Sequence, residues 1–152
     1  MAQFIADKFK QKGLIISRNN IEVILEKSEG HPHFTQYFAS VVYDQIKDGI
    51  NQDNKEFNNL WLNKIIDTQS LIFQNIYDQL NNNQRNILYA IAMLETEIFS
   101  KKNRKQFNLP STSNMTININ SLINKDLVNK EINTYKISNP IFKAWILKIN
   151  QK

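Results

Sequence analysis

The sequence contains no cysteine, and only three glycines, three prolines and two histidines occur among its 152 residues. The absence of cysteine excludes disulfides, thiolate metal sites and cysteine nucleophiles. Three isolated glycines cannot build a G-x-x-x-x-G-K-[ST] phosphate-binding loop or a G-x-G-x-x-G turn, and neither motif occurs in the sequence. The scarcity of both chain-breaking residues favours helices over a turn-rich β-sandwich.

Long apolar runs are also missing from the sequence. No stretch approaches the roughly 18 consecutive apolar residues of a membrane span. The first residues, Met1-Ala2-Gln3-Phe4, carry no basic segment followed by an apolar run, which a secretory signal requires. Hydrophobic residues make up 41% of the chain and charged residues 22%, as is typical of globular proteins. We therefore expect a cytoplasmic protein with no membrane partner.

The net charge of +5 is distributed unevenly along the chain. Residues 1–97 contain nine Lys/Arg and twelve Asp/Glu, a net charge of −3, whereas residues 98–152 contain ten and two, a net charge of +8. Such asymmetry indicates two units, of which the second favours anionic partners. The run Asn81-Asn82-Asn83 suits a turn. We therefore expect one domain over residues 1–80 and another over residues 81–152.

Apolar residues at helical spacing predict five helices in residues 1–80. The expected segments are 2–12, the stretch between Ser17 and Gly30, the stretch between Pro32 and Gly49, 57–65, and 71–80. Ser17 is the expected N-cap of the second helix. Proline is well tolerated in the first turn of a helix, so Pro32 is the expected start of the third.

Residues 81–152 show shorter and more varied elements. The expected order is a helix over 84–94, a short strand at 97–99, a short basic helix capped by Ser100, a helix capped by Ser111 or Ser113, strands at 127–128 and 134–137, and a helix from Pro140. This is the order of a winged helix-turn-helix. Thr116–Asn120 alternates with period two, so a strand is the rival interpretation there, but the stripe of Met115, Ile119, Leu122 and Ile123 favours a helix. The predicted fold is mainly α, a helical bundle followed by a winged helix with a small β-hairpin.

Residues able to carry catalysis are few. A zinc site would need carboxylates beside His31 and His33, yet residues two apart on a helix do not face together. Nothing around Ser28 or Ser40 resembles a nucleophile elbow. We therefore expect no catalytic residues, no metal and no enzymatic activity of the chain itself. A small enzyme that uses His31 or His33 is the alternative of a different class.

The segment Gly30-His31-Pro32 is the sharpest local feature. A glycine that ends one helix, followed by a proline that opens the next, leaves free backbone N–H groups at a helix N-terminus. Such a terminus attracts anions. The alternative is a tight helix–helix corner in which His31 is a polar cap.

Basic residues flank the expected helix-turn-helix. They are Lys101, Lys102, Arg104 and Lys105 near its first helix, and Lys125, Lys130 and Lys136 near the hairpin. Winged helices place the second helix of this motif in the DNA major groove and the hairpin against the backbone. The lysines and arginine therefore predict contacts with phosphates of duplex DNA. A solubilising surface is the alternative explanation.

The outward face of the second helix supports a different partner. At roughly 100° per residue, its outward residues are Ser113, Ile117, Asn120, Ser121 and Asn124. This face contains no Lys or Arg. Asn120 or Asn124 can pair with adenine, whereas an exposed Ile117 is more typical of a protein contact. Duplex DNA and another protein therefore both remain candidate partners.

Several segments resemble the C-terminal part of a known ATPase family. They are Phe9–Gly13, Ile16, Ile21, Ser28–Pro32 and Phe34–Gln36 in the first half, and Asn83–Arg85, Leu109–Ser113, Leu127-Val128 and Asn139–Ile146 in the second. In this order they resemble the helical lid and winged helix of archaeal-type, AAA-related signal-transduction (STAND) P-loop ATPases. Asp126 departs from the family pattern, which often has glycine there, so the exact turn before Leu127 is expected to be weaker while the fold is retained.

The resemblance implies a role beside a nucleotide. The family's lid carries a G-x-P motif, so Gly30 and Pro32 are expected to lie against adenine, with His31 near the phosphates or the domain seam. The family's Walker motifs lie in a preceding P-loop domain, which would hold ATP and Mg²⁺ and be the partner in cis. No cofactor is expected on these residues alone. The resemblance thus implies a non-catalytic regulatory module, and a stand-alone winged-helix DNA-binding protein is the alternative.

Overall fold

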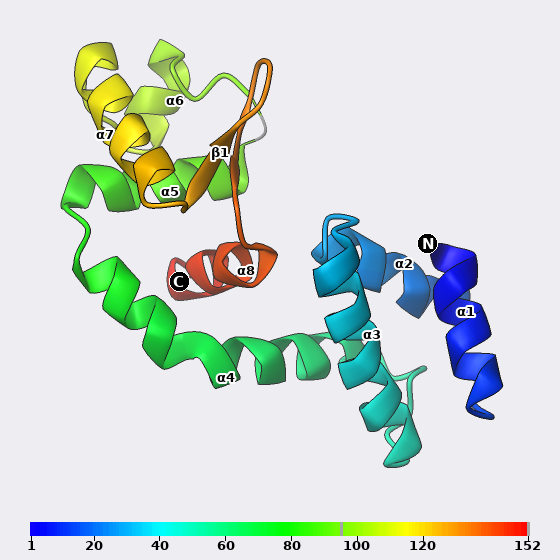
Figure 1. The fold of residues 1–152 in the computed structure, drawn as a ribbon. Helices are drawn as coiled ribbons and strands as arrows, with labels where there is room; N and C mark the ends of the chain where they lie inside the picture. The colour runs from blue at the N-terminus through cyan, green and yellow to red at the C-terminus, as the bar shows by residue number, and fades with distance from the viewer. Residues whose placement is uncertain (95, 152) are drawn as a thin grey trace. The chain divides into compact units, whose positions relative to one another are not determined.

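The computed structural model describes residues 1–94 and 96–151. Within these residues the chain is mainly helical, with eight helices and one antiparallel β-hairpin near the C-terminus (Figure 1). The elements are α1 (Ala2–Gln11), α2 (Arg18–Lys27), α3 (Pro32–Lys47), α4 (Phe57–Asp78), α5 (Asn82–Met93), α6 (Lys101–Gln106), α7 (Thr112–Asn124), β1 (Val128–Lys130), β2 (Tyr135–Ile137) and α8 (Pro140–Ile149). The predicted fold class is confirmed. No helix in the described ranges combines the length and the apolarity needed to cross a bilayer.

The chain forms two compact units. The first comprises Met1–Thr68 and the second comprises the described residues from Gln69 onward. Helix α4 begins in the first unit and ends in the second. The division into compact units does not test whether residues 1–80 and residues 81–152 are independent domains, so that division stays a prediction.

The first unit is built from α1, α2, α3 and the start of α4. Helix α2 packs against both α1 and α3. The core contains large side chains that are at most 3% exposed, namely Ile5, Phe9, Ile24, Phe38, Val42, Phe57, Trp61 and Ile65. The rings of Phe38 and Trp61 lie 5.5 Å apart between centroids. These side chains repeat at helical spacing, so each helix buries one stripe.

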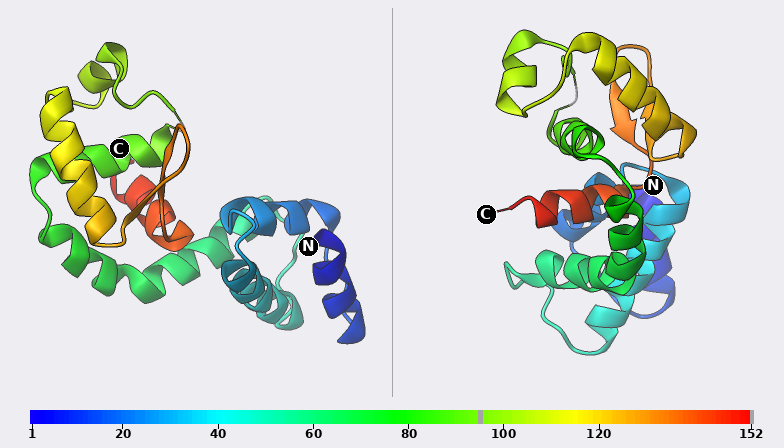
Figure 2. Two further views of the ribbon diagram at one scale, coloured as in Figure 1. Left: turned by 45° about the horizontal axis from the view of Figure 1, so that its top comes forward. Right: turned by 90° about the vertical axis from the view of Figure 1, so that its left-hand side faces the viewer.

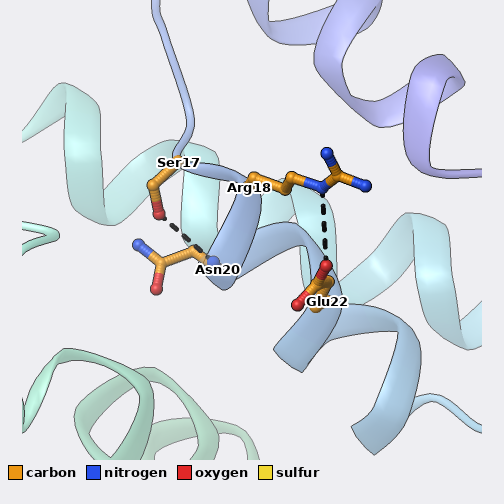
Figure 3. Close-up of polar contacts among 4 residues, drawn as sticks. All are labelled: Ser17, Arg18, Asn20 and Glu22. Atoms are coloured by element: carbon orange, nitrogen blue, oxygen red, sulfur yellow. Dashed lines mark hydrogen bonds and ion pairs between the residues drawn. The ribbon is translucent and has the colours of Figure 1, made fainter.

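A polar network fixes the start of α2. The predicted cap is confirmed, since the Ser17 hydroxyl accepts a hydrogen bond from the backbone N–H of Asn20 at 3.2 Å (Figure 3). Asn20 is only 2% exposed. Its amide donates to the carbonyl oxygen and the side-chain oxygen of Gln52, at 3.1 and 3.2 Å, and its oxygen accepts from Asn58 at 3.1 Å. The network therefore ties α2 to the loop before α4 and to α4 itself.

The second unit is a winged helix. Helix α5 packs against α7, α8 and β2 (Figures 1 and 2). The hairpin pairs Val128 with Ile137 and Lys130 with Tyr135. In the core of the second unit, the aromatic rings of Phe73, Phe142 and Trp145 pack together, with centroids 5.1 to 5.9 Å apart. The predicted helix through residues 116–120, the hairpin and the last helix are all confirmed.

Two predictions of secondary structure are wrong. The helices expected at 57–65 and 71–80 form the single helix α4, because no glycine or proline interrupts the chain between them. The strand expected at 97–99 is a turn, in which the backbone N–H of Ser100 donates to the Glu97 carbonyl at 3.0 Å. Glu97 has a φ of 63°, which is incompatible with an extended strand. The turn leads into α6, whose predicted cap Ser100 is confirmed by a 3.1 Å bond to Asn103.

Candidate functional site

The corner between α2 and α3 changes the direction of the chain through two left-handed residues. Glu29 and Gly30 have φ values of 54° and 70°. The backbone N–H of Gly30 donates to the Leu25 carbonyl at 3.1 Å, which closes the end of α2. Pro32 then occupies the first turn of α3, as predicted.

A buried pair of hydroxyls holds the two helices together behind this corner. The Ser28 and Thr35 oxygens lie 2.7 Å apart, and the two residues are 0% and 1% exposed. The Ser28 hydroxyl also lies 3.3 Å from the Leu25 carbonyl. Ser28 is the C-cap residue of α2 and Thr35 belongs to α3. The hydroxyl pair therefore restrains the conformation of the residues between them.

The predicted residues Gly30, His31 and Pro32 come together at the exposed surface of the corner. His31 is the N-cap residue of α3, but its side chain makes no cap hydrogen bond, so the alternative of a polar side-chain cap is wrong. Its ring instead lies edge-on to Phe34 at 6.0 Å, and His33 lies on the same ring at 5.3 Å. The backbone N–H groups of His33 and Phe34 have no hydrogen-bond partner within residues 1–94 and 96–151.

The corner therefore presents two free donors and two imidazoles to solvent. Helix N-termini of this kind favour negative charge. In the part of the chain that the structure describes, no three His, Asp or Glu side chains are grouped as metal ligands would be.

Helix α7 presents an uncharged face to solvent. Ser113, Ile117, Asn120 and Asn124 are all exposed, with Ile117 at 66%. Ser121 was also expected to point outward, but it is half-buried and accepts a hydrogen bond from the Gln84 amide at 3.1 Å. The structure therefore groups four of the five expected residues into one polar surface with an isoleucine.

The predicted basic residues divide into two groups. Five of them are exposed and form no ion pair with any residue in the described ranges, namely Lys101, Lys102, Lys105, Lys125 and Lys130. Arg104 is half-buried, and its Nε donates to the Phe99 carbonyl at 3.1 Å, so it stabilises the turn before α6. Lys136 lies 3.7 Å from the Glu131 carboxylate. Arg104 and Lys136 are therefore less available to an anionic partner.

Sequence reasoning missed the tip of the wing. The wing is the hairpin of β1 and β2, and its turn is closed by a 2.8 Å hydrogen bond from the Glu131 N–H to the Thr134 carbonyl. Ile132 lies in this turn and is 96% exposed. An isoleucine in an otherwise polar turn was the available signal. The wing and α7 therefore each expose one large aliphatic side chain.

Comparison with known proteins agrees with this architecture. The sequence pattern of a family described as "Probable winged helix domain" matches residues 71–148. Among solved structures, the Walker-type ATPase of Pyrococcus abyssi has a similar fold, with a TM-score of 0.69 and 18% sequence identity. The similarity covers 96% of this chain and 40% of the ATPase chain, so this chain spans less than half the length of that protein. No curated protein matches the sequence.

Proposed function

The chain belongs to the family described as a probable winged helix domain, and on this premise we propose that it is the non-catalytic, C-terminal regulatory module of a Walker-type ATPase of the AAA-related STAND class. One observation carries the proposal: the fold of nearly the whole chain, in both units, recurs within an ATPase chain that is more than twice as long. The winged helix accounts for only the second unit, whereas the structural likeness extends over the first unit as well, and this supports the proposal that the first unit is a helical lid.

Within this proposal the corner at Gly30–Pro32 is the part of the lid that faces nucleotide. Gly30 and Pro32 lie against the adenine. His31 and the free N–H groups of His33 and Phe34 oppose the negative charge of the phosphates. The P-loop domain supplies the Walker residues and holds Mg²⁺, so this chain adjusts nucleotide affinity and does not perform the transfer.

The winged helix then serves as a docking surface for protein. The exposed face of α7 has no cation to contact phosphates, and Ile117 stands within that face. Ile132 extends from the wing, where contact with a DNA backbone would favour Lys or Arg. The five exposed lysines support the alternative, a DNA-binding winged helix, through phosphate attraction alone.

Two measurements test the ATPase assignment. The gene that encodes this chain should contain a Walker motif in frame before residue 1. In the resulting full-length protein, P32A combined with G30V should weaken ATP binding by about tenfold, which corresponds to roughly 1.4 kcal/mol. The control K27A alters an exposed lysine outside the corner and should leave affinity unchanged. Unchanged affinity in the double variant would refute the lid assignment.

The fluorescence anisotropy of labelled duplex DNA, titrated with the protein, distinguishes a DNA-binding winged helix from one that docks to protein. We expect no saturable binding by the 152-residue chain at roughly 50 mM salt. Binding that weakens steeply towards roughly 200 mM, and that is lost when Lys101, Lys102 and Lys105 are changed to alanine, would establish the DNA-binding alternative.

A further inference from the structure

The first unit contains an open groove between α1 and α3. Its volume is about 380 Å³, and its lining runs along α1 from Phe4 to Lys12, the residue that follows the helix. Eight residues of helix rise about 12 Å, so the groove is elongated. No residue of the exposed corner Gly30–Pro32 lines it.

The floor of the groove is apolar and aromatic. Ile5 and Phe9 are 2% and 3% exposed. The rings of Phe9 and Tyr43 pack edge to face, with their centroids 5.7 Å apart. Phe4 is 47% exposed at the groove's side. An exposed phenylalanine beside a hollow of this size provides a site for apolar side chains of a ligand.

Two lysines stand along the α1 side of the groove. The Nζ atom of Lys8 lies 5.5 Å from the centroid of the Phe4 ring, and that of Lys12 lies 4.6 Å from the Tyr43 centroid. Such cation–π contacts restrain the positions of both ammonium groups. Neither lysine forms an ion pair with any residue in 1–94 or 96–151.

The spacing of the two lysines matches that of a helix. Residues four apart lie on one helical face, roughly 6 Å from each other, so Lys8 and Lys12 form a pair of positive charges one turn apart. The only carboxylate in the described lining is that of Asp44, on α3. The α1 side of the groove is therefore positive and the floor is apolar.

From this arrangement we infer that the groove binds an amphipathic helix of a partner protein that carries two carboxylates one turn apart. The charge pattern selects the acidic residues, and the apolar floor receives the hydrophobic side chains between them, as in other helix-in-groove complexes. The length of the groove favours a helix, because the apolar floor extends beside both lysines over about two helical turns. This inference goes beyond the proposed function and does not depend on nucleotide or on the winged helix.

A synthetic peptide provides the probe. It is an 18-residue helix with Leu and Phe on one face and Glu pairs four residues apart along its edge, and it is titrated by calorimetry into the 152-residue chain. The control peptide has Lys in place of every Glu. We expect the acidic peptide to bind at least about tenfold more tightly than the basic one, because charge complementarity governs selectivity.

Charge-matched variants locate the binding. K8E with K12E should weaken the acidic peptide by about tenfold or more and reverse the preference between peptides. The control pair, K10E with K47E, changes exposed lysines on α1 and α3 that do not line the groove. The affinity of this control variant for the acidic peptide should stay within about twofold of that of the parent chain. F4A should weaken both peptides through lost apolar contact.

Absence of acidic-peptide binding would overturn the inference. So would equal weakening by the control pair, or amide chemical-shift changes that lie outside α1 and α3. Circular dichroism of each variant confirms folding, and the exposure of the altered residues makes loss of fold unexpected.

Discussion

Replacing Asn20 with alanine tests the polar network of the first unit. The change removes two hydrogen bonds donated to Gln52 and one accepted from Asn58. Each contributes about 1 kcal/mol net, and the partially buried partners are left without their acceptor or donor. Alanine recovers roughly 0.5 kcal/mol through its higher helix propensity. We therefore expect a loss of about 2–3 kcal/mol in the free energy of unfolding.

This loss is large for a unit of this size. One kcal/mol lowers the melting temperature of a 60–100-residue domain by roughly 4–8 °C, so we expect a decrease of roughly 10–20 °C for the first unit. Thermal and urea unfolding, followed by circular dichroism and tryptophan fluorescence, measure it. Trp61 is a suitable reporter because its indole N–H donates to Asn58 at 2.8 Å.

The neighbouring residue supplies the control. Asn19 lies in the same turn of α2 and is exposed, so N19A gains the helix propensity without losing the network. It should be as stable as the parent chain or slightly more stable. Equal stability of N20A and N19A would refute the view that the network stabilises the unit.

Four further substitutions have expected outcomes. Arg85→Lys removes the Nε bond to the Tyr77 carbonyl at 3.1 Å and the guanidinium stacked on the Tyr77 ring at 4.6 Å, and urea unfolding should show a loss of about 1–2 kcal/mol. Asp126→Gly relieves a φ of 60° and should raise stability by about 1 kcal/mol in a thermal melt. Ser28→Ala and Thr35→Val should each destabilise by about 1–2 kcal/mol, whereas the double variant should lose less than the sum; additive losses would contradict a direct hydroxyl pair.

Local signals made the helix caps and the corner predictable from the sequence. The caps at Ser17 and Ser100 act over three residues, and both were identified correctly. Ser111 is the N-cap residue of α7, as one of the two expected candidates, but its side chain makes no cap hydrogen bond. Asp126 was expected to weaken the turn before Leu127, yet it adopts the left-handed conformation that glycine would take there. Aspartate tolerates this region better than most residues, which explains why the turn is retained.

Contacts distant in sequence were not predictable. Leu71 and Ile72 belong to the apolar spacing from which a helix was predicted at 71–80, yet they are 75% and 62% exposed, while Phe73 is buried on the rings of Phe142 and Trp145. Arg104 looked like a free surface cation because its acceptor is a carbonyl in a turn that had been expected to be a strand. The groove depends on α1 and α3 lying near each other, which no spacing along the chain indicates.

Two requirements can restrict a position to glycine, namely the backbone conformation and the lack of space for a side chain, and at the left-handed corner only the first applies. At Gly30 an added Cβ would meet no atom within 4 Å, although the φ of 70° disfavours most side chains. Position 30 is thus constrained by backbone geometry while space for a larger group remains open. Asparagine, which accepts this geometry, would introduce an amide into the same empty space, and so the chemistry of the corner can diversify among descendants without any rearrangement of the two helices that frame it.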